Sequence, residues 1–266
     1  QALDAVKRRK REGPEQIAWM QGALAKLAHL DLDVPPPVLA QQLHQWLRRQ
    51  SGEADPFGDA KRASTRQALT WLPGVRARVV AADDPFDAAV RMAIAGNIID
   101  LGAKSRLDEH EVQEVLDTAL TMPLAGDSQA LAREVDRAGR ILYLADNAGE
   151  LVFDRLLLER LPLGRVTVVV KGAPVINDAT REDAAASQLD PRLRVMDNGS
   201  DAPGTVLEDC RPEFRDAFAR ADVIIAKGQG NFETLAEVRA PIFFLFKIKC
   251  RVVADRTKLP VGTPVL

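Results

Sequence analysis

The spacing of apolar residues changes near residue 139 and divides the chain into two parts. Before this point, apolar residues recur three and four positions apart, as in "ALAKLAHL", "VLAQQLHQWL" and "AAVRMAIAGNIIDL". This spacing predicts amphipathic helices. Helix starts are marked by the prolines at 35–37, by "DDP" at 83–85 and by "DS" at 127–128. We therefore predict a helical domain of about six helices over residues 1–139.

Five short runs rich in β-branched residues follow and alternate with helical segments. The runs lie at 141–145, 166–170, 193–196, 222–226 and 242–246. Most of them are continuously apolar, which indicates strands that are buried on both faces. Helices are predicted between them, near 150–161, 179–187, 204–220 and 231–238. This alternation predicts an α/β domain over residues 140–266, with a mainly parallel sheet covered by helices.

Polar residues gather where four of these strands end. The ends carry Asp146-Asn147 with Glu150, Lys171-Gly172 with Asn177-Asp178, "DNGSD" at 197–201 and "KGQGN" at 227–231. Any one of these ends, taken alone, is explained by a turn or a helix cap. Four together weaken that explanation, because the carboxyl ends of parallel strands meet at one edge of a sheet, where ligands bind.

The histidines and cysteines do not contribute to this edge. All three histidines lie in the helical part, and His29 and His44 fall on apolar stretches that indicate packing. The two cysteines, Cys210 and Cys250, are far apart in sequence. The sequence therefore shows no Ser-His-Asp or Cys-His arrangement, and it disfavours a zinc site of thiolates or imidazoles.

Without histidine and cysteine, the polar side chains at this edge are mainly carboxylates, amides and lysines. The candidate metal ligands are Asp146, Asn147 and Asp178, with Asp201 as a further candidate. Carboxylate and amide oxygens suit Mg²⁺ or Mn²⁺. Lys171 and Lys227 lie beside them, and the helices that start after Gly149 and Gly230 add positive potential. A divalent cation with lysines and helix starts is an arrangement that suits a phosphate ester.

Several of these stretches also resemble a known family. "DNAGE", "KGAPVINDAT", "DNGSDAPGT" and "KGQGNFETL", with "AIAGNIIDLG" in the helical part, are similar to the damage-control phosphatases, formerly domain-of-unknown-function family 89. The resemblance is to their short prokaryotic branch, and it covers nearly the whole chain in the right order. It implies a Rossmann-like three-layer α/β/α domain with an N-terminal all-helical domain packed on it. It also implies a metal-dependent phosphatase acting on small phosphorylated metabolites, such as sugar phosphates or cofactor-precursor phosphates, in metabolite damage control.

The resemblance implies roles for individual residues. Asp146, Asn147 and Asp178 would hold a divalent ion (Mn, Co, Ni or Mg), and Asp146, Asp178 and Lys227 are the expected catalytic residues. The expected contacts to substrate are Asn97, Asp100, Glu150, Lys171, Ser200, Asp201, Lys227, Gly228 and Asn231. Lys227 and Asn231 would face the phosphate. Asn97 and Asp100, three apart on one helix face, would close a cleft between the two domains; the alternative is a hydrogen bond between packed helices.

Three other functions are alternatives to the phosphatase. A dinucleotide site is disfavoured because Glu233 replaces the third glycine of the fingerprint and the next strand ends in basic residues. A carboxyl methyltransferase that uses S-adenosylmethionine would need an adenosine pocket, and "KGQG" is the only well-placed glycine-rich loop for it in the sequence. A non-catalytic metal- or metabolite-binding module is the third. Within the phosphatase, direct attack by water is favoured over a phosphoenzyme, since no strand ends in Asp-x-Asp.

Bulk properties restrict the partners and the location. The 266 residues are 46% hydrophobic and 28% charged, and their net charge of −2 favours neither nucleic acid nor anionic membrane. The basic run at residues 7–11 is expected to be a solvated helix face, and no apolar run is long enough to span a membrane. Two separated cysteines fit a reducing compartment, so we expect a cytoplasmic protein. The chain begins with Gln1 rather than Met, so we expect that it lacks its natural start.

Overall fold

The computed structural model describes residues 14–31, 33–99 and 109–266, so the basic run at 7–11 lies outside the described residues. One sheet of six strands forms the centre of the protein, in the order β3-β2-β1-β4-β5-β6. The strands are β1 (Ile141–Leu144), β2 (Val166–Val170), β3 (Arg194–Asp197), β4 (Val223–Lys227), β5 (Ile242–Lys247) and β6 (Pro264–Val265). The first five are parallel and β6 is antiparallel to β5. The five predicted strands are therefore confirmed, and their order is that of a Rossmann-like sheet.

Six helices precede the sheet in the described part of the chain, as predicted. They are α2 (Pro14–Ala28), α3 (Pro36–Ser51), α4 (Gly58–Ala81), α5 (Pro85–Ile99), α6 (Glu109–Thr121) and α7 (Ser128–Arg137). The later helices are α8 (Glu150–Leu158), α9 (Arg181–Ala186), α10 (Pro212–Ala219), α11 (Gly228–Leu235) and α12 (Arg251–Thr257), with short 3₁₀ turns η1 (Leu163–Arg165) and η2 (Leu207–Asp209). Among the described residues, none of these helices is both long and apolar enough to cross a membrane.

Two details of the second part differ from the prediction. The helix expected over 204–220 is shorter, because a loop and η2 precede Pro212, which occupies the first turn of α10. The sequence pattern also missed α12 and β6, whose seven and two residues are too few to show a periodicity.

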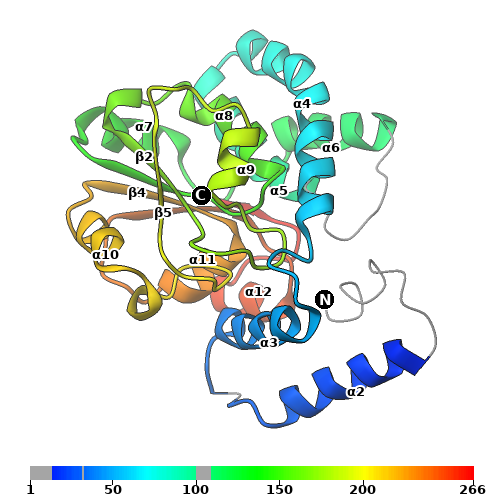
Figure 1. Cartoon of the computed structure of the whole chain (residues 1–266). Helices are drawn as coiled ribbons and strands as arrows, with labels where there is room; N and C mark the ends of the chain where they lie inside the picture. Colours follow the sequence, from blue (N-terminus) through cyan, green and yellow to red (C-terminus); the bar gives the residue numbers. More distant parts are fainter. Residues whose placement is uncertain (1–13, 32, 100–108) are drawn as a thin grey trace.

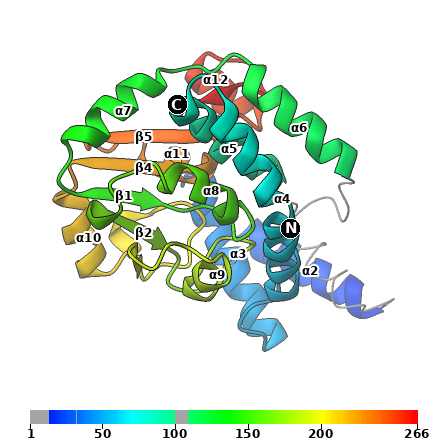
Figure 2. The ribbon, with the colours of Figure 1, turned by 90° about the horizontal axis from the view of Figure 1, so that it is seen from above.

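The sheet buries both faces, as its continuously apolar strands predict. Leu142, Val169 and Ile224 pack on one side against Phe214 of α10 and Leu235 of α11. Alternate residues of the same strands, including Tyr143, Val168 and Ile225, pack on the other side with residues of α4, α5, α7 and α8. The protein therefore has three layers, with the sheet between two groups of helices (Figures 1 and 2).

The main hydrophobic core crosses the predicted boundary at residue 139. Val79 of α4, Ile94 of α5 and Leu131 of α7 belong to the same buried cluster as Tyr143 and Phe153. Helix α5 contacts both α8 and β5. A separate cluster of Ala23, Leu43, Leu47 and Phe57 holds α2 and α3 together. A self-contained helical domain over 1–139 is thus not confirmed, since most of its described helices form one layer of the α/β fold.

Gly96 lies where α5 packs tightly against α8. A Cβ atom at this position would lie 3.1 Å from Cβ of Phe153 and 3.4 Å from Cγ of Glu150. Phe153 and Glu150 are both buried, so neither can move aside into solvent. The sequence "AIAGNIIDLG" therefore places a glycine where two helix backbones need to meet closely.

We predict that Gly96→Leu lowers the free energy of unfolding by about 1–3 kcal/mol, because extra atoms in a filled interface force side chains and backbone apart. Urea unfolding followed by circular dichroism measures the change. The matched control is Gly74→Ala in α4, where a Cβ would meet nothing within 4 Å. This control should stabilise the helix by about 0.5–1 kcal/mol. If Gly96→Leu were as stabilising as the control, the close packing of α5 on α8 would be disproved.

Candidate active site

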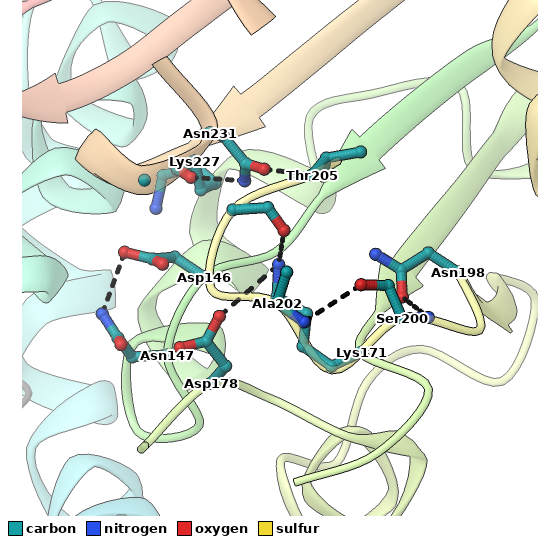
Figure 3. A network of polar contacts seen from close by, with 12 residues as sticks. Asp146, Asn147, Lys171, Asp178, Asn198, Ser200, Ala202, Thr205, Lys227 and Asn231 are labelled. Atoms are coloured by element: carbon teal, nitrogen blue, oxygen red, sulfur yellow. Dashed lines mark hydrogen bonds and ion pairs between the residues drawn. The ribbon is translucent and has the colours of Figure 1, made fainter. Parts of the chain in front are cut away.

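The predicted polar residues meet at the point where the strand connections diverge. β1 and β4 are neighbours in the sheet, and the connections that follow them run in opposite directions along it. From β1 the chain continues to β2, toward one edge of the sheet, and from β4 it continues to β5, toward the other edge. In open α/β sheets, ligands bind in the crevice beyond the carboxyl ends of two such strands. Asp146 and Asn147 follow β1, Lys227 ends β4 and Gly228 starts α11, so both sets lie at the carboxyl ends of these two strands. Asp146, Asn147 and Lys227 are labelled in Figure 3.

Backbone hydrogen bonds hold the loop after β1 against the loop after β2. The two bonds run from Ala148 N to Asn177 O at 2.9 Å and from Ala179 N to Asp146 O at 2.8 Å. Asn147 is thereby paired with Asp178 as in an antiparallel bridge. The structure thus brings together Asp146, Asn147 and Asp178, the three residues predicted to be metal ligands (Figure 3).

Negative charge accumulates around these residues. Asn147 and Asp178 are buried, and Asp146 is partly exposed. Burial raises the pKa of Asp146 to about 7, and the carboxylates of Glu150 and Asp178 contribute to the rise, which Lys249 and Lys171 offset only in part. The site therefore carries more negative charge than its lysines balance, an arrangement that a bound cation would relieve.

The donor set fits a hard divalent cation. The Nδ2 atom of Asn147 donates to Oδ2 of Asp146 at 3.0 Å and to Oε2 of Glu150 at 2.9 Å. Because the nitrogen faces the two carboxylates, the amide oxygen is the atom of Asn147 that is left to act as a ligand. Within the described residues no three His, Cys, Asp or Glu side chains are grouped to hold a metal, so the set of Asp146, Asn147 and Asp178 depends on the amide oxygen as its third member.

The start of α11 lies directly against Asp146. Gly228, the first residue of α11, has a φ angle of 80°, which L side chains rarely adopt. A Cβ atom there would lie 2.0 Å from Oδ2 of Asp146. Only glycine lets the first turn of α11 approach this closely, and the amide groups of that turn give the crevice positive potential.

Lys227 occupies a different position from the one expected. Its side chain is fully buried, and its Nζ atom donates to O of Ala93 at 2.8 Å, to Oδ1 of Asp154 at 2.6 Å and to Glu150. These three bonds use all three protons of an ammonium group. Burial alone would lower the pKa of Lys227, but Asp154 and Glu150 outweigh burial and hold the pKa above its usual value. All three protons of the Lys227 ammonium group are therefore bonded to other parts of the protein.

Asn231 also faces the protein. Its Nδ2 atom donates to O of Lys227 at 2.7 Å, and its Oδ1 atom accepts from Oγ1 of Thr205 at 2.7 Å (Figure 3). The side chain is 1% exposed. Its contacts fix the first turn of α11 to the loop after β3, which differs from the expected contact with phosphate.

Ser200 and Asp201 lie in the loop after β3 and are held by other parts of the protein. The hydroxyl of Ser200 donates to Oδ2 of Asp209 at 2.5 Å. Asp201 accepts hydrogen bonds from three side chains of α3: Gln41, Gln45 and Arg48. Burial alone would raise the pKa of Asp201, but these donors hold it below its usual value. Figure 1 shows α3 beside α11, so a helix from the start of the chain covers the loops of this edge.

Two functional candidates escaped the sequence analysis. Lys249 follows β5 at the same edge, is exposed, and acts electrostatically on Asp146. Its position could have been inferred from the basic end of the fifth strand. Asp154 is completely buried one helical turn after Glu150, and it was hidden in the leucine-rich stretch of α8. The side chain of Asn97 and all of Asp100 lie outside the described residues, so their predicted place in a cleft stays a prediction.

Comparison with known proteins gives the family. The model of the damage-control phosphatase ARMT1-like domain matches residues 1–265. A damage-control phosphatase of Pyrococcus horikoshii is 40% identical over 220 residues, which cover 80% of this chain and 75% of that protein. A damage-control phosphatase of Archaeoglobus fulgidus is 34% identical over 232 residues, covering 85% and 80%. The chain belongs to the damage-control phosphatase ARMT1-like family.

A solved structure agrees with this assignment. The crystal structure of a domain-of-unknown-function family 89 protein from Pyrococcus horikoshii matches with a TM-score of 0.90 and 33% identity, covering 100% of this chain and 93% of that one. The resemblance predicted from the motifs is therefore confirmed, and the match to the family covers nearly the whole chain.

The buried position of Lys227 leads to a stability prediction. We expect Lys227→Met to lower the free energy of unfolding by about 3–5 kcal/mol, because Glu150 and Asp154 would remain buried without their cation. Lys249→Met is the matched control, since its side chain is exposed and its loss should hardly change stability. Urea unfolding of both variants measures the difference. Equal stability of the two variants would contradict the buried role of Lys227.

Proposed function

We propose that this protein is a metal-dependent phosphatase that hydrolyses small phosphorylated metabolites in metabolite damage control. The observation that carries the proposal is the meeting of Asp146, Asn147 and Asp178 on two hydrogen-bonded loops, opposite the start of α11. The names of the relatives from Pyrococcus and Archaeoglobus support a phosphatase. Membership of the family supports the same class of reaction.

The two carboxylates and the amide oxygen would hold Mn²⁺, Mg²⁺, Co²⁺ or Ni²⁺. Such a cation, when bound, supplies Lewis-acid stabilisation of the charge on the phosphoryl oxygens. Lys171 keeps Asp178 in place, because its Nζ atom lies 3.5 Å from Oδ2 of Asp178 and also donates to O of Gly204. Since Lys171 is 3% exposed, its role in the proposal is to orient a ligand rather than to meet substrate.

The phosphate would lie between the carboxylates and the first turn of α11. Gly228, Gln229 and Gly230 form this first turn, and no earlier helical turn supplies carbonyl acceptors for their amide groups. These amide groups would therefore donate to the phosphate oxygens. Lys249 is an exposed ammonium at this edge and would bind a remaining phosphate oxygen. Gln229 fixes the backbone next to it, since Oε1 of Gln229 accepts from N of Lys249 at 3.0 Å.

Phosphate monoesters resist hydrolysis, and enzymes lower the barrier by on the order of 20 kcal/mol or more. One well-aimed donor contributes about 3–4 kcal/mol to a transition state, so no single contact in this site suffices. The proposal therefore requires the cation, Lys249 and the amides of α11 to act on the same phosphoryl group.

We predict that Asp146→Asn and Asp178→Asn each reduce kcat about a hundredfold or more and weaken Mn²⁺ binding, because each removes one negative charge from a hard-cation site. Steady-state assays on sugar phosphates and cofactor-precursor phosphates, beside calorimetric Mn²⁺ titration, measure both effects. The control is Asp216→Asn, an exposed acid on α10 that should change neither. Full activity after exhaustive chelation would reject the metal-dependent phosphatase, and S-adenosylmethionine binding without turnover of any ester would favour the methyltransferase.

We predict a different effect for Lys249→Ala. Loss of this phosphate contact should lower kcat/KM about ten- to a hundredfold while Mn²⁺ affinity stays unchanged, and Lys249→Arg should retain most of the efficiency. Arg194→Ala is the control, because Arg194 is exposed at the opposite end of a strand, the start of β3. Unchanged kcat/KM in Lys249→Ala would remove Lys249 from the proposed phosphate site.

A further inference from the structure

The carboxamide of Asn147 can turn either of two atoms toward a cation, and only its oxygen can be a ligand. The structure has the nitrogen directed at two carboxylates, 3.0 Å from Oδ2 of Asp146 and 2.9 Å from Oε2 of Glu150. Asp146 is itself an expected ligand, so a bound cation competes for its oxygens. Glu150 is fully buried and its other oxygen is paired with Lys227, which leaves it as the acceptor that the proposed cation would not bind.

We propose that Glu150 is a positioning residue that orients the amide oxygen of Asn147 toward the metal site. The inference rests on the proposed metal-dependent function and assigns Glu150 a task other than the contact with substrate that the sequence suggested. Glu150 acts through Asn147 and touches neither phosphate nor the reacting atoms.

The second oxygen of Glu150 is fixed with equal firmness. Its Oε1 atom accepts from Lys227, which also donates to Oδ1 of Asp154 at 2.6 Å and to O of Ala93 at 2.8 Å. Glu150 and Asp154 are four residues apart on α8 and so share one face of the helix. Glu150, Asp154 and Lys227 are all 0% exposed. The carboxylate of Glu150 therefore cannot rotate without breaking a buried ion pair.

This arrangement requires a carboxylate at position 150. Both of its oxygens accept a hydrogen bond, one from Asn147 and one from Lys227. A glutamine has one acceptor and one donor group, so it would turn an N–H toward either Asn147 or Lys227. Because Lys227 can only donate, the glutamine oxygen should stay with Lys227, and its nitrogen should then favour the amide oxygen of Asn147. That exchange would rotate the amide and present nitrogen to the cation.

The test is calorimetric Mn²⁺ titration of purified protein, with wild type, Glu150→Gln, Asn147→Asp and the double variant as a thermodynamic cycle. Glu150→Gln should weaken Mn²⁺ binding about ten- to a hundredfold, the usual effect of losing a residue that orients a ligand. Adding Asn147→Asp to Glu150→Gln should restore most of the affinity. A carboxylate at position 147 can accept from the glutamine and still offer its other oxygen to the cation.

A stability control separates orientation from general loss of structure. Oδ2 of Asp222 accepts from N of Gly139 at 3.0 Å and N of Arg140 at 2.8 Å, at the start of β4 and far from the crevice. Asp222→Asn should lower the urea midpoint and leave Mn²⁺ affinity as in wild type. Glu150→Gln should change both quantities.

The results of these titrations test the positioning role of Glu150 and the proposed metal site separately. Wild-type affinity in Glu150→Gln, or a double variant that binds no better than Glu150→Gln, would overturn the positioning role and leave the proposed function standing. Absence of Mn²⁺ binding in the wild type would overturn the proposed metal site and this inference with it. Rescue in the double variant, together with loss in Glu150→Gln, is the expected result.

Discussion

The buried ion pair of Lys227 with Glu150 and Asp154 is the interaction on which the candidate site depends. An unpaired ion in a protein interior costs several kcal/mol, so the three side chains must stay together for the fold to persist. They come from the end of β4 and from two turns of α8, and the third bond of Lys227 reaches Ala93 on α5. The ammonium group of Lys227 thus fixes the relative positions of β4, α5 and α8 next to the candidate site.

Glu150 connects this buried ion pair to the expected metal ligands. Glu150 receives Lys227 on one oxygen and the amide of Asn147 on the other. Asn147 lies in the loop that is paired with the loop of Asp178. If the proposed metal site exists, stability and metal binding would be linked in this protein, because Glu150 accepts both from the buried Lys227 and from the amide that would hold a cation.

The outer part of the site is held by polar contacts across large sequence distances. Gln41, Gln45 and Arg48 of α3 bind Asp201, which lies more than 150 residues later in the chain. Lys61 at the start of α4 is buried between Asp55 and Asp183 of α9, at 2.8 and 2.7 Å. These polar contacts join α3 to the loop after β3 and the start of α4 to α9, in addition to the apolar packing of α4 on α8. The loop after β3 is accordingly fixed between α3 on one side and α11 on the other.

Predictions were accurate where they depended on local pattern. Continuous β-branched runs fixed the five parallel strands to within one or two residues, because a strand buried on both faces has few alternatives. The parallel order then placed four polar strand ends at one edge, and Asp146, Asn147 and Asp178 do lie together. The boundary at residue 139 followed the change of period in the sequence, yet periodicity cannot tell whether helices pack on one another or on a sheet. Here α4 to α7 share a core with the sheet, and α2 and α3 form a separate cluster.

The sequence by itself determined the strands, the edge of the sheet at which they end and the chemical types available there. Only the tertiary structure decided the directions of the side chains. A lysine at the end of a strand can face a ligand or the interior, and Lys227 faces inward because Glu150, Asp154 and the carbonyl of Ala93 meet there. Lys249 became a candidate because the fold carries the end of β5 to Asp146, about 100 residues away in sequence. Both outcomes depend on partners distant in the chain, which no local pattern of apolar and polar residues encodes.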